Sequence, residues 1–362
     1  MTALPVLIRA DASSVMGHGH VMRCLALAAA LRERGAIPVF AQVAQAGDAS
    51  AAIAAADCRL LALSSVDDAQ ACLQVWLDAA LPPPAVLVVD HYGLDARWVQ
   101  AFHAGCAARG WALPVVLVID DLANRPLLGD WLLDQNWHVD PAARYAAHWQ
   151  GPAAQTLFGP GFALLRHEFA QARAALRERR AALSRVVLAF GGSDPPDATD
   201  RCIAVLREGL GDSVCIDAVI GGGNPHVATL AARWQGDAAV TLTVAATDMA
   251  ARFAAADLFV GAGGSMTWER ACLGLPGITL TLADNQEPLC RALADAGEGV
   301  HLGPWTGSDA QCQALLAAVR ELATDSPRRL DMGRRLAARL DGRGAARVAH
   351  ALWSAVLSAA RA

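Results

Sequence analysis

Short apolar runs alternate with helical patterns along this chain of 362 residues, and this alternation is the feature that most restricts its fold. Several runs, such as Val86–Val89, are apolar at every position rather than at every second one. Strands of that kind are buried on both faces, which is typical of a parallel sheet covered by helices. In the first half we predict strands at Pro5–Arg9, Pro38–Gln42, Arg59–Leu63, Ala85–Asp90 and Pro114–Asp120, with helices at Met22–Arg34, Ala49–Ala56, Asp67–Ala79 and Asp95–Arg109.

The alternation restarts after a less regular connection at about 136–166, which carries Gly151-Pro152 and Gly159-Pro160-Gly161. The second series predicts strands at Arg185–Phe190, Cys215–Ile220, Val240–Val244, Leu258–Val260, Ile278–Leu282 and Gly299–His301, with helices that begin near Asp197, Pro225, Thr247, Ser265, Gln286 and Ser308. Two such series imply an α/β protein of two doubly wound, Rossmann-like domains that face a cleft. We place the first domain at residues 1–163 and the second at 164–362, with last helices that could reach back to the first.

The amino-acid composition excludes several classes of enzyme chemistry. The chain contains no lysine, which excludes Schiff-base chemistry, pyridoxal phosphate attachment and the lysine of a P-loop. Its nine cysteines are scattered without a Cys-x-x-Cys pair, as expected for small buried side chains in a reducing compartment. There is also no Asp-x-Asp triplet of the kind that holds a divalent cation against a diphosphate. We therefore expect no metal site, no cofactor and a metal-independent reaction.

The net charge and the hydropathy of the chain indicate which kinds of binding partner to expect. The formal net charge of −5 and the lack of basic blocks argue against nucleic acid as the main partner. No apolar stretch reaches the roughly eighteen residues that a membrane span needs. No positively charged region precedes the first short apolar run, so no signal peptide is expected. We expect a cytoplasmic protein without stable membrane association or an obligate protein partner.

The stretch from Ile8 to Cys24 is the most informative motif. An apolar strand runs into small and glycine residues, and His20 then stands at the start of an alanine-rich helix. A glycine loop before a helix exposes backbone N–H groups at the positive end of the helix dipole, which suits an anion. The same dipole end disfavours an imidazolium, so His20 is expected to be neutral and able to accept a proton. This pattern predicts chemistry on a phosphorylated small molecule.

A purely structural interpretation of this motif remains open. Glycines are common in strand-to-helix turns, and Met22 stands where a dinucleotide-binding fingerprint would have its third glycine. His18 is interpreted as a loop residue rather than as a second catalytic group. The motif alone therefore does not decide between a turn and a ligand site.

Other predicted strands also end in polar or glycine-rich groups, at 90–93, 120–121, 190–194 and 261–265, and further polar groups lie at 134–136 and, at the start of a helix, at 285–286. The loop at 261–265 opens a helix whose N–H groups could hold a diphosphate, and Glu269, about one turn further on, could reach a ribose diol. Taken singly, each group is equally compatible with a turn or a helix cap. Their common place at the carboxyl ends of parallel strands is what indicates a ligand site.

These motifs, with Gly159–Phe169 and Gly263–Glu269, resemble the UDP-2,4-diacetamido-2,4,6-trideoxy-β-L-altropyranose hydrolases of bacterial pseudaminic acid biosynthesis. The similarity runs through nearly the whole chain. It implies a glycosyltransferase-B-type fold and an enzyme that binds a UDP-sugar. It also implies attack of water at the anomeric carbon, with inversion and release of UDP.

The resemblance also implies roles for individual residues. His20 matches the proposed general base, Tyr92 would lie near the sugar, and Glu269 would contact the ribose. The substrate-binding positions carried over are Asp11, Ser14, Gly17, Gly19, Arg23, Tyr92, Gly192, Ser193, Gly264, Ser265, Glu269, Asn285 and Gln286. Met266 departs from the pattern, because a small hydroxylic residue is usual there for a diphosphate contact.

Three other functions compete with this hydrolase. An inverting glycosyltransferase of the same fold would pass the sugar from a UDP-sugar donor to an acceptor hydroxyl, and would need an acceptor groove. A nucleotide-sugar-binding protein without turnover would not need a base at His20. A hydrolase of a related nucleotide-sugar cannot be separated by sequence, since pocket shape decides which sugar is accepted.

Overall fold

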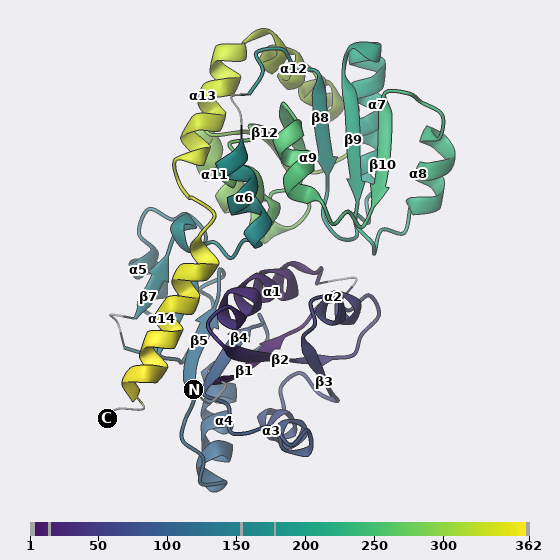
Figure 1. Ribbon diagram of the computed structural model, residues 1–362. Coiled ribbons are helices and arrows are strands. Elements are labelled where there is room, and N and C mark those ends of the chain that lie inside the picture. The colour runs from purple at the N-terminus through teal and green to yellow at the C-terminus, as the bar shows by residue number, and fades with distance from the viewer. Residues whose placement is uncertain (1–3, 14–15, 153–154, 177–178, 360–362) are drawn as a thin grey trace. The chain divides into compact units, whose positions relative to one another are not determined.

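The computed structural model describes residues 4–13, 16–152, 155–176 and 179–359. The chain divides into two compact units, of which the first comprises Met1–Arg166 with Arg343–Ala362 and the second His167–Gly342. Each unit is built around one parallel sheet with helices on both faces (Figure 1). The predicted α/β class with two Rossmann-like domains is confirmed.

The first unit contains a seven-stranded parallel sheet in the order β3-β2-β1-β4-β5-β6-β7. Its strands are β1 (Leu4–Ala10), β2 (Ala36–Val43), β3 (Arg59–Leu63), β4 (Val86–Asp90), β5 (Val115–Ile119), β6 (Trp131–Asp134) and β7 (Thr156–Phe158). Its helices are α1 (Gly19–Arg32), α2 (Ser50–Ala55), α3 (Ala69–Asp78), α4 (Ala96–Ala108), α5 (Pro141–Tyr145) and α14 (Gly344–Ala359).

Alternate residues of β1 explain why helices cover both faces of this sheet. Val6 and Ile8 pack in one apolar cluster with side chains from α1, α2 and α14. Leu7 packs on the opposite side, in a second cluster with side chains from α3 and α4. A strand buried on both faces in this way needs apolar residues at every position. That need is the reason its sequence reads as an uninterrupted apolar run.

The second unit contains a six-stranded parallel sheet in the order β10-β9-β8-β11-β12-β13. Its strands are β8 (Arg185–Ala189), β9 (Cys215–Ile220), β10 (Val240–Val244), β11 (Leu258–Gly261), β12 (Gly277–Thr281) and β13 (Val300–Pro304). Its α-helices are α6 (His167–Ala175), α7 (Ala198–Leu210), α8 (Val227–Trp234), α9 (Met249–Ala255), α10 (Met266–Cys272), α11 (Glu287–Asp295), α12 (Asp309–Thr324) and α13 (Ser326–Ala337).

The two faces of the second sheet are covered by different helices. Leu258 and Val260 of β11 pack in a cluster with side chains from α7 and α12. Phe259, on the other face, meets Phe253 of α9 edge-on at a ring-centroid distance of 5.8 Å. Phe253 in turn lies 6.4 Å from the ring of Phe169 in α6. The core of this unit therefore lies in two layers, one on each side of the sheet.

The predicted elements agree closely with these bounds, except that the short helix α5, in the region expected to be irregular, was not predicted. Strands β6 and β7 were also not predicted, and β7 lies within the same region. They have only four and three residues, and β7 forms the edge of the sheet. Strands this short carry too few apolar positions to stand out from loop sequence.

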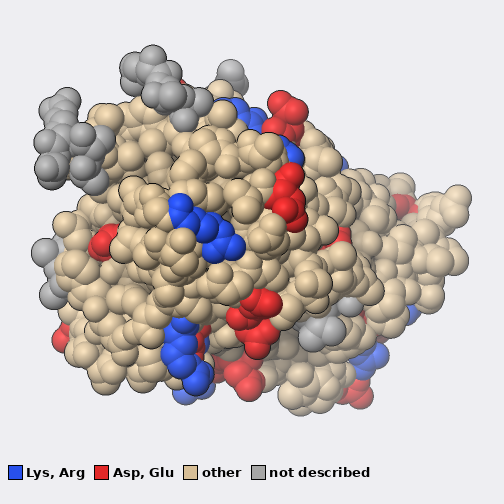
Figure 2. Space-filling view, turned by 90° about the horizontal axis from the view of Figure 1, so that it is seen from below, with Lys and Arg blue, Asp and Glu red and all other residues tan. Residues whose placement is uncertain are grey.

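The distribution of surface charge and the hydropathy of the helices can be compared with the expectations about nucleic acid and membranes. On the face drawn in Figure 2, arginines and acidic side chains lie interspersed in small groups rather than as a basic stripe. Within the described residues, no helix combines the length and the apolar character that crossing a bilayer requires.

Candidate functional site

In each unit, sequence motifs follow both of the strands at which the sheet order reverses. In the first unit β1 pairs with β4, so that Ala10 lies beside Asp90. In the second unit β8 pairs with β11, so that Ala189 lies beside Gly261. Neighbouring strands at such a switch point send their chains to opposite faces of the sheet, which leaves a crevice for ligands at their carboxyl ends. Sheet topology therefore explains why residues far apart in the sequence meet here.

His20 pairs with a buried carboxylate from the neighbouring strand. His20 lies in the first turn of α1, as predicted, and its Nδ1 is 2.6 Å from Oδ1 of Asp90. Asp90 is fully buried at the end of β4, and the His20 side chain is 6% exposed. An ionised carboxylate can only accept, so the proton of this bond belongs to Nδ1. The other ring nitrogen, Nε2, is then the one that can accept a proton.

Arg23, one turn along α1, holds the other side of this carboxylate. Its Nε donates to Oδ2 of Asp90 at 2.6 Å, and its Nη2 donates to Oδ1 at 2.6 Å. Nη2 also lies 3.2 Å from Nδ1 of His20, but Nδ1 carries a proton for Asp90 and cannot accept a second bond. The guanidinium thus fixes the carboxylate that in turn fixes the imidazole.

A second carboxylate completes the network. Nη1 of Arg23 donates to Oδ2 of Asp121 at 3.1 Å, and the hydroxyl of Tyr92 donates to Oδ1 of Asp121 at 2.8 Å. The Tyr92 ring meets the imidazole of His20 edge-on, with ring centroids 4.4 Å apart. Tyr92, the predicted sugar-side residue, is therefore held next to the candidate base.

The charge states of this network follow from its partners. Burial by itself raises the pKa of Asp90, but the charge and hydrogen bonds of Arg23 and His20 outweigh it and hold the pKa well below its usual range. Burial, reinforced by Asp121, raises the pKa of Tyr92 well above its usual range. At neutral pH the site therefore contains an ionised Asp90 and a neutral phenol.

Asp11 lies in a buried layer beside this network. It is fully buried and forms a two-pronged pair with Arg9, at 2.5 and 2.9 Å. Its oxygens are also 3.0 Å from the amide nitrogen of Val43 and 3.3 Å from Nε2 of His91. Since Nδ1 of His91 accepts from the amide of Gly93, the proton of the neutral ring is on Nε2, at 3.3 Å from the Asp11 carboxylate. The carboxylate is thus occupied by protein groups.

The loop between β1 and α1 contains the remaining predicted positions of the first unit. Gly17 has a φ of +77°, a left-handed conformation that favours glycine, and its N–H donates to the Ser13 carbonyl at 2.8 Å. Gly19 is the first residue of α1. Ser14 lies outside the described residues. His18 was expected to be a loop residue and precedes α1, with Nε2 2.9 Å from the carbonyl of Gly47.

In the second unit, the loop after β8 packs tightly against its neighbour. A Cβ on Gly221, at the end of β9, would lie 2.2 Å from the carbonyl oxygen of Gly192 and 2.4 Å from that of Gly191. Asp194 then caps α7 by accepting from the amides of Ala198 and Thr199, each at 2.9 Å. Gly192 and Ser193 therefore lie in a turn whose backbone path is fixed on both sides.

The loops after β11 and β12 also meet. A Cβ on Gly263 would lie 1.9 Å from Sγ of Cys290, and one on Gly264 would lie 3.8 Å from Nε2 of Gln286. Oε1 of Gln286 accepts from the Leu282 amide at 3.0 Å. The structure thus brings Gly264 and Gln286 together, as their place at adjacent strand ends implied.

The polar residues of these loops differ in exposure. Ser265 and Asn285 are exposed, whereas Gly264, Glu269 and Gln286 are half-buried. Glu269 lies in the first turn of α10. These residues all lie at the carboxyl edge of the second sheet, on two neighbouring strand ends.

A cavity of about 500 Å³ opens beside these loops, at the carboxyl ends of β12 and β13. It is lined by Thr281, Asp284, Glu287 and Trp305 among others. A hydrogen bond from Arg291 lowers the pKa of Glu287 to about 2, against the opposing effect of burial and with further bonds from His301 and Thr281. Glu287 therefore contributes a fixed negative charge to this cavity.

Sequence reasoning missed the two carboxylates that organise the base. Asp90 and Asp121 were recognised only as polar residues at strand ends, and neither was named as a site residue. Asp90 is 70 positions from His20, so only the pairing of β1 with β4 reveals their contact. Among the described residues there is no group of three or more His, Cys, Asp or Glu side chains that could hold a metal ion.

Comparison with known proteins gives one curated relative. No family model matches the chain. The spore coat polysaccharide biosynthesis protein SpsG of Bacillus subtilis (strain 168) is 25% identical over 192 residues, which are 52% of this chain and 56% of that protein. The match thus spans about half the length of this relative.

Solved structures resemble the chain over nearly its whole length. MurG of Acinetobacter baumannii is 13% identical, with 97% of this chain and 99% of that chain covered at a TM-score of 0.61. The spinosyn rhamnosyltransferase SpnG complexed with thymidine diphosphate is 16% identical, with 93% and 95% covered at 0.61. The calicheamicin glycosyltransferase CalG4 is 16% identical, with 99% of each chain covered at 0.61. At these identities the likeness concerns the fold, and the chain has the glycosyltransferase-B-type fold.

Proposed function

We propose that this protein is a hydrolase that cleaves UDP from a UDP-sugar at the anomeric carbon, with His20 as the general base. The observation that carries the proposal is the pairing of His20 with the buried Asp90 at a switch point of the sheet. A histidine whose Nδ1 is fixed by a carboxylate presents Nε2 as a proton acceptor and is stabilised once it becomes charged.

In the proposed reaction, a water molecule attacks the anomeric carbon as the bond between that carbon and the UDP oxygen breaks. Nε2 of His20 takes the proton of the water, and Asp90 stabilises the resulting imidazolium. UDP leaves with the bonding electron pair, and the sugar is released with inverted anomeric configuration. Because UDP is a good leaving group, a positioned water, a base and donors to the diphosphate are the main requirements.

The other site residues take binding or positioning roles in this proposal. The loops at Gly192-Ser193 and Gly264-Ser265 would donate N–H groups to the diphosphate. Glu269 would accept from the ribose hydroxyls, and Asn285 and Gln286 would contact the nucleotide-sugar. In the first unit, Tyr92 would lie against the sugar, with Gly17 and Gly19 shaping the loop around it.

Asp11 and Arg23 act by positioning rather than by touching the sugar. Arg23 is 8% exposed, and its guanidinium is engaged by Asp90 and Asp121. Asp11 is fully buried between Arg9 and His91. Because His91 directly follows Asp90, we infer that Asp11 holds the loop that carries both Asp90 and Tyr92.

The proposed substrate is UDP-2,4-diacetamido-2,4,6-trideoxy-β-L-altropyranose, in the biosynthesis of pseudaminic acid. The resemblance of the motifs supports this choice, and the name of the SpsG relative places that protein in polysaccharide biosynthesis. A related nucleotide-sugar is the nearest alternative substrate, since sugar stereochemistry is read by pocket shape.

An inverting glycosyltransferase is the second candidate function. It is favoured by the names of the solved structures of the same fold, among them a rhamnosyltransferase and a calicheamicin glycosyltransferase. In that case His20 would deprotonate an acceptor hydroxyl instead of water. The low exposure of His20, at 5%, favours a nucleophile as small as water.

The proposal is tested by measuring UDP release from this UDP-sugar without acceptor and with a metal chelator present. We expect turnover by the wild type and a fall of about 10²–10⁴-fold in kcat for His20→Ala, the usual contribution of a general base. His18→Ala is the matched control, since His18 contacts the Gly47 carbonyl outside the Asp90 network, and it should retain activity. UDP binding without release would favour the transferase.

A further inference from the structure

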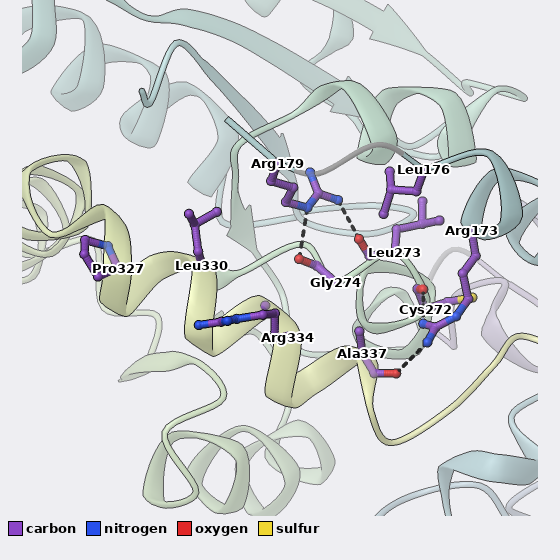
Figure 3. Close-up of a pocket in the computed structure, with 11 residues that line it drawn as sticks. Arg173, Leu176, Arg179, Cys272, Leu273, Gly274, Pro327, Leu330, Arg334 and Ala337 are labelled. Atoms are coloured by element: carbon purple, nitrogen blue, oxygen red, sulfur yellow. Dashed lines mark hydrogen bonds between the residues drawn. The ribbon is translucent and has the colours of Figure 1, made fainter. Parts of the chain in front are cut away.

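A second cavity, of about 410 Å³, lies in the second unit and contains none of the candidate site residues (Figure 3). It is bounded by Arg173 at the end of α6, by Leu176 and Arg179, by the end of α10, and by one side of α13. Small-molecule pockets typically have volumes of about 300–1,000 Å³. The cavity is therefore large enough for a ligand of its own.

Topology places this cavity at the opposite edge of the sheet from the proposed nucleotide site. Helix α10 runs from the carboxyl end of β11 to the amino end of β12. Ser265 and Glu269 lie at or near its first turn, whereas the cavity is lined by Cys272–Gly274 at its end. A ligand here would contact the amino edge of the sheet and leave the carboxyl-edge loops free.

The lining is positively charged. Arg173, Arg179 and Arg334 line the cavity, and no aspartate or glutamate does so among the described lining residues. This concentration of positive charge is local, because the whole chain has a net charge of −5. An anionic group entering the cavity would meet the exposed guanidinium of Arg334, with the positive charges of Arg173 and Arg179 nearby and no aspartate or glutamate among the described lining residues.

Two of these arginines are held by backbone carbonyls. Arg173 donates to the carbonyl of Cys272 at 2.6 Å and to that of Ala337 at 3.1 Å. Arg179 donates to the carbonyls of Gly274 at 3.0 Å and Leu273 at 2.8 Å, as the dashed lines in Figure 3 mark. Carbonyls at helix ends carry only about half a negative charge per helix, so this part of the lining keeps a net positive charge.

Arg179 remains charged at neutral pH, and Arg334 is the accessible arginine of the lining. Burial lowers the pKa of Arg179 to about 10, although the nearby Asp257 opposes this effect. Arg334 is 75% exposed and lies 3.3 Å from Asp331 of the same helix. An exposed pair of this kind is worth little, so Arg334 can turn toward a ligand at small cost.

The rest of the lining is apolar. Leu330 projects from α13 one turn before Arg334, and Leu176 and Leu273 lie across from it (Figure 3). The positions 327, 330, 333, 334 and 337 that α13 contributes are spaced to share one side of a helix. The cavity thus combines an apolar wall with guanidinium groups, which is the complement of a molecule that has an apolar body and an acidic group.

We propose that this cavity binds a small amphipathic anion. Its apolar body packs against Leu176, Leu273 and Leu330, and its acidic group pairs with the guanidinium groups, first of all with Arg334. This inference does not depend on the proposed hydrolase activity, because it uses different residues at the other edge of the sheet.

The test uses anilinonaphthalene sulfonate, an amphipathic anion that fluoresces when it enters an apolar site. The full chain is titrated with the dye, with and without UDP, and the titration is repeated with the uncharged parent compound, anilinonaphthalene. Leu330→Trp fills the cavity, and Arg334→Ala removes the accessible cation. Arg335→Ala is the matched control, because Arg335 is also exposed on α13 and pairs with Asp331 but does not line the cavity.

We expect one saturable dye site that UDP does not compete for. Arg334→Ala and removal of the sulfonate should each weaken binding by about tenfold, the value of one charge-assisted contact. Leu330→Trp should abolish binding and Arg335→Ala should leave it unchanged. Absence of a saturable site, competition by UDP, or equal binding by wild type and Arg334→Ala would overturn the proposal. Since Arg334 is exposed, its variant tests the idea even if Leu330→Trp fails to fold.

Discussion

Replacing Asp90 by asparagine removes the negative charge that holds a proton on Nδ1 of His20. The asparagine amide can donate to Nδ1, and the proton of a neutral imidazole then moves to Nε2. An imidazole protonated on Nε2 cannot accept a proton from the attacking nucleophile. We therefore expect Asp90→Asn to lose most of the general-base contribution, about 10²–10⁴-fold in kcat.

The same substitution has a calculable structural cost. Arg23 is 8% exposed and would keep only Asp121, at 3.1 Å, as a charged partner. Removing one member of a buried ion pair typically costs about 3–5 kcal/mol. The thermal midpoint should fall, and kcat must be referred to the folded fraction of the variant. KM should change little, since Asp90 is fully buried and is not a substrate contact.

The assay is steady-state UDP release by wild type, Asp90→Asn and Asp121→Asn, with thermal melts of each. Asp121→Asn is the control, because it leaves the bond between His20 and Asp90 intact while it disturbs Arg23 and Tyr92. Its kcat should fall much less than that of Asp90→Asn. A folded Asp90→Asn variant with wild-type kcat would refute the assignment of Asp90 as the residue that orients the base.

Three further predictions address the fold. Tyr92 and Tyr145 are the two tyrosines of the chain, and burial with nearby carboxylates raises the pKa of both well above the usual value of about 10. Their phenolate absorbance should therefore appear only as the protein unfolds in alkali, and ionisation near pH 10 in the folded state would contradict this. Gly221→Ala places a Cβ 2.2 Å from the carbonyl oxygen of Gly192 and should lower the thermal midpoint. Gly222→Ala is the control, because its Cβ would lie 3.6 Å from the nearest atom, and it should leave the midpoint unchanged. Equal midpoints for the two variants would refute the close packing of these loops. Burial raises the pKa of Asp11, but hydrogen bonds from protein groups outweigh it and hold the pKa below its usual range. Ionised Asp11 therefore stabilises the folded state fully above pH about 4, and this contribution is lost as the pH falls. The thermal midpoint of the wild type should accordingly fall more steeply in acid than that of Asp11→Asn, and parallel curves would count against this ion pair.

Most of the fold could be predicted because parallel strands covered on both faces need apolar residues at every position. The buried strands β4, β5 and β11 were each predicted to within one residue of the bounds that they have. Strand β7 was not, because its three residues at the sheet edge give no periodic signal. Local sequence patterns thus identify the apolar strands of the sheet interior but do not reveal a three-residue strand at the sheet edge.

The candidate site was predictable only in part. The place of His20 in the first turn of its helix follows from the glycine loop before it. Its contact with Asp90 depends on the order of strands in the sheet, which the alternation of strands and helices does not specify. The surroundings of Asp11 have the same origin in part: Arg9 is only two residues away, in β1, but His91 follows the neighbouring strand β4.

The central claim is that water attacks the anomeric carbon of a UDP-sugar. It is tested most directly by running the reaction in water labelled with heavy oxygen and locating the label in the products by mass spectrometry. We predict the label on the released sugar and none on UDP, with no requirement for an acceptor. Label in the phosphate of the nucleotide, or no UDP release until an acceptor alcohol is added, would contradict the account.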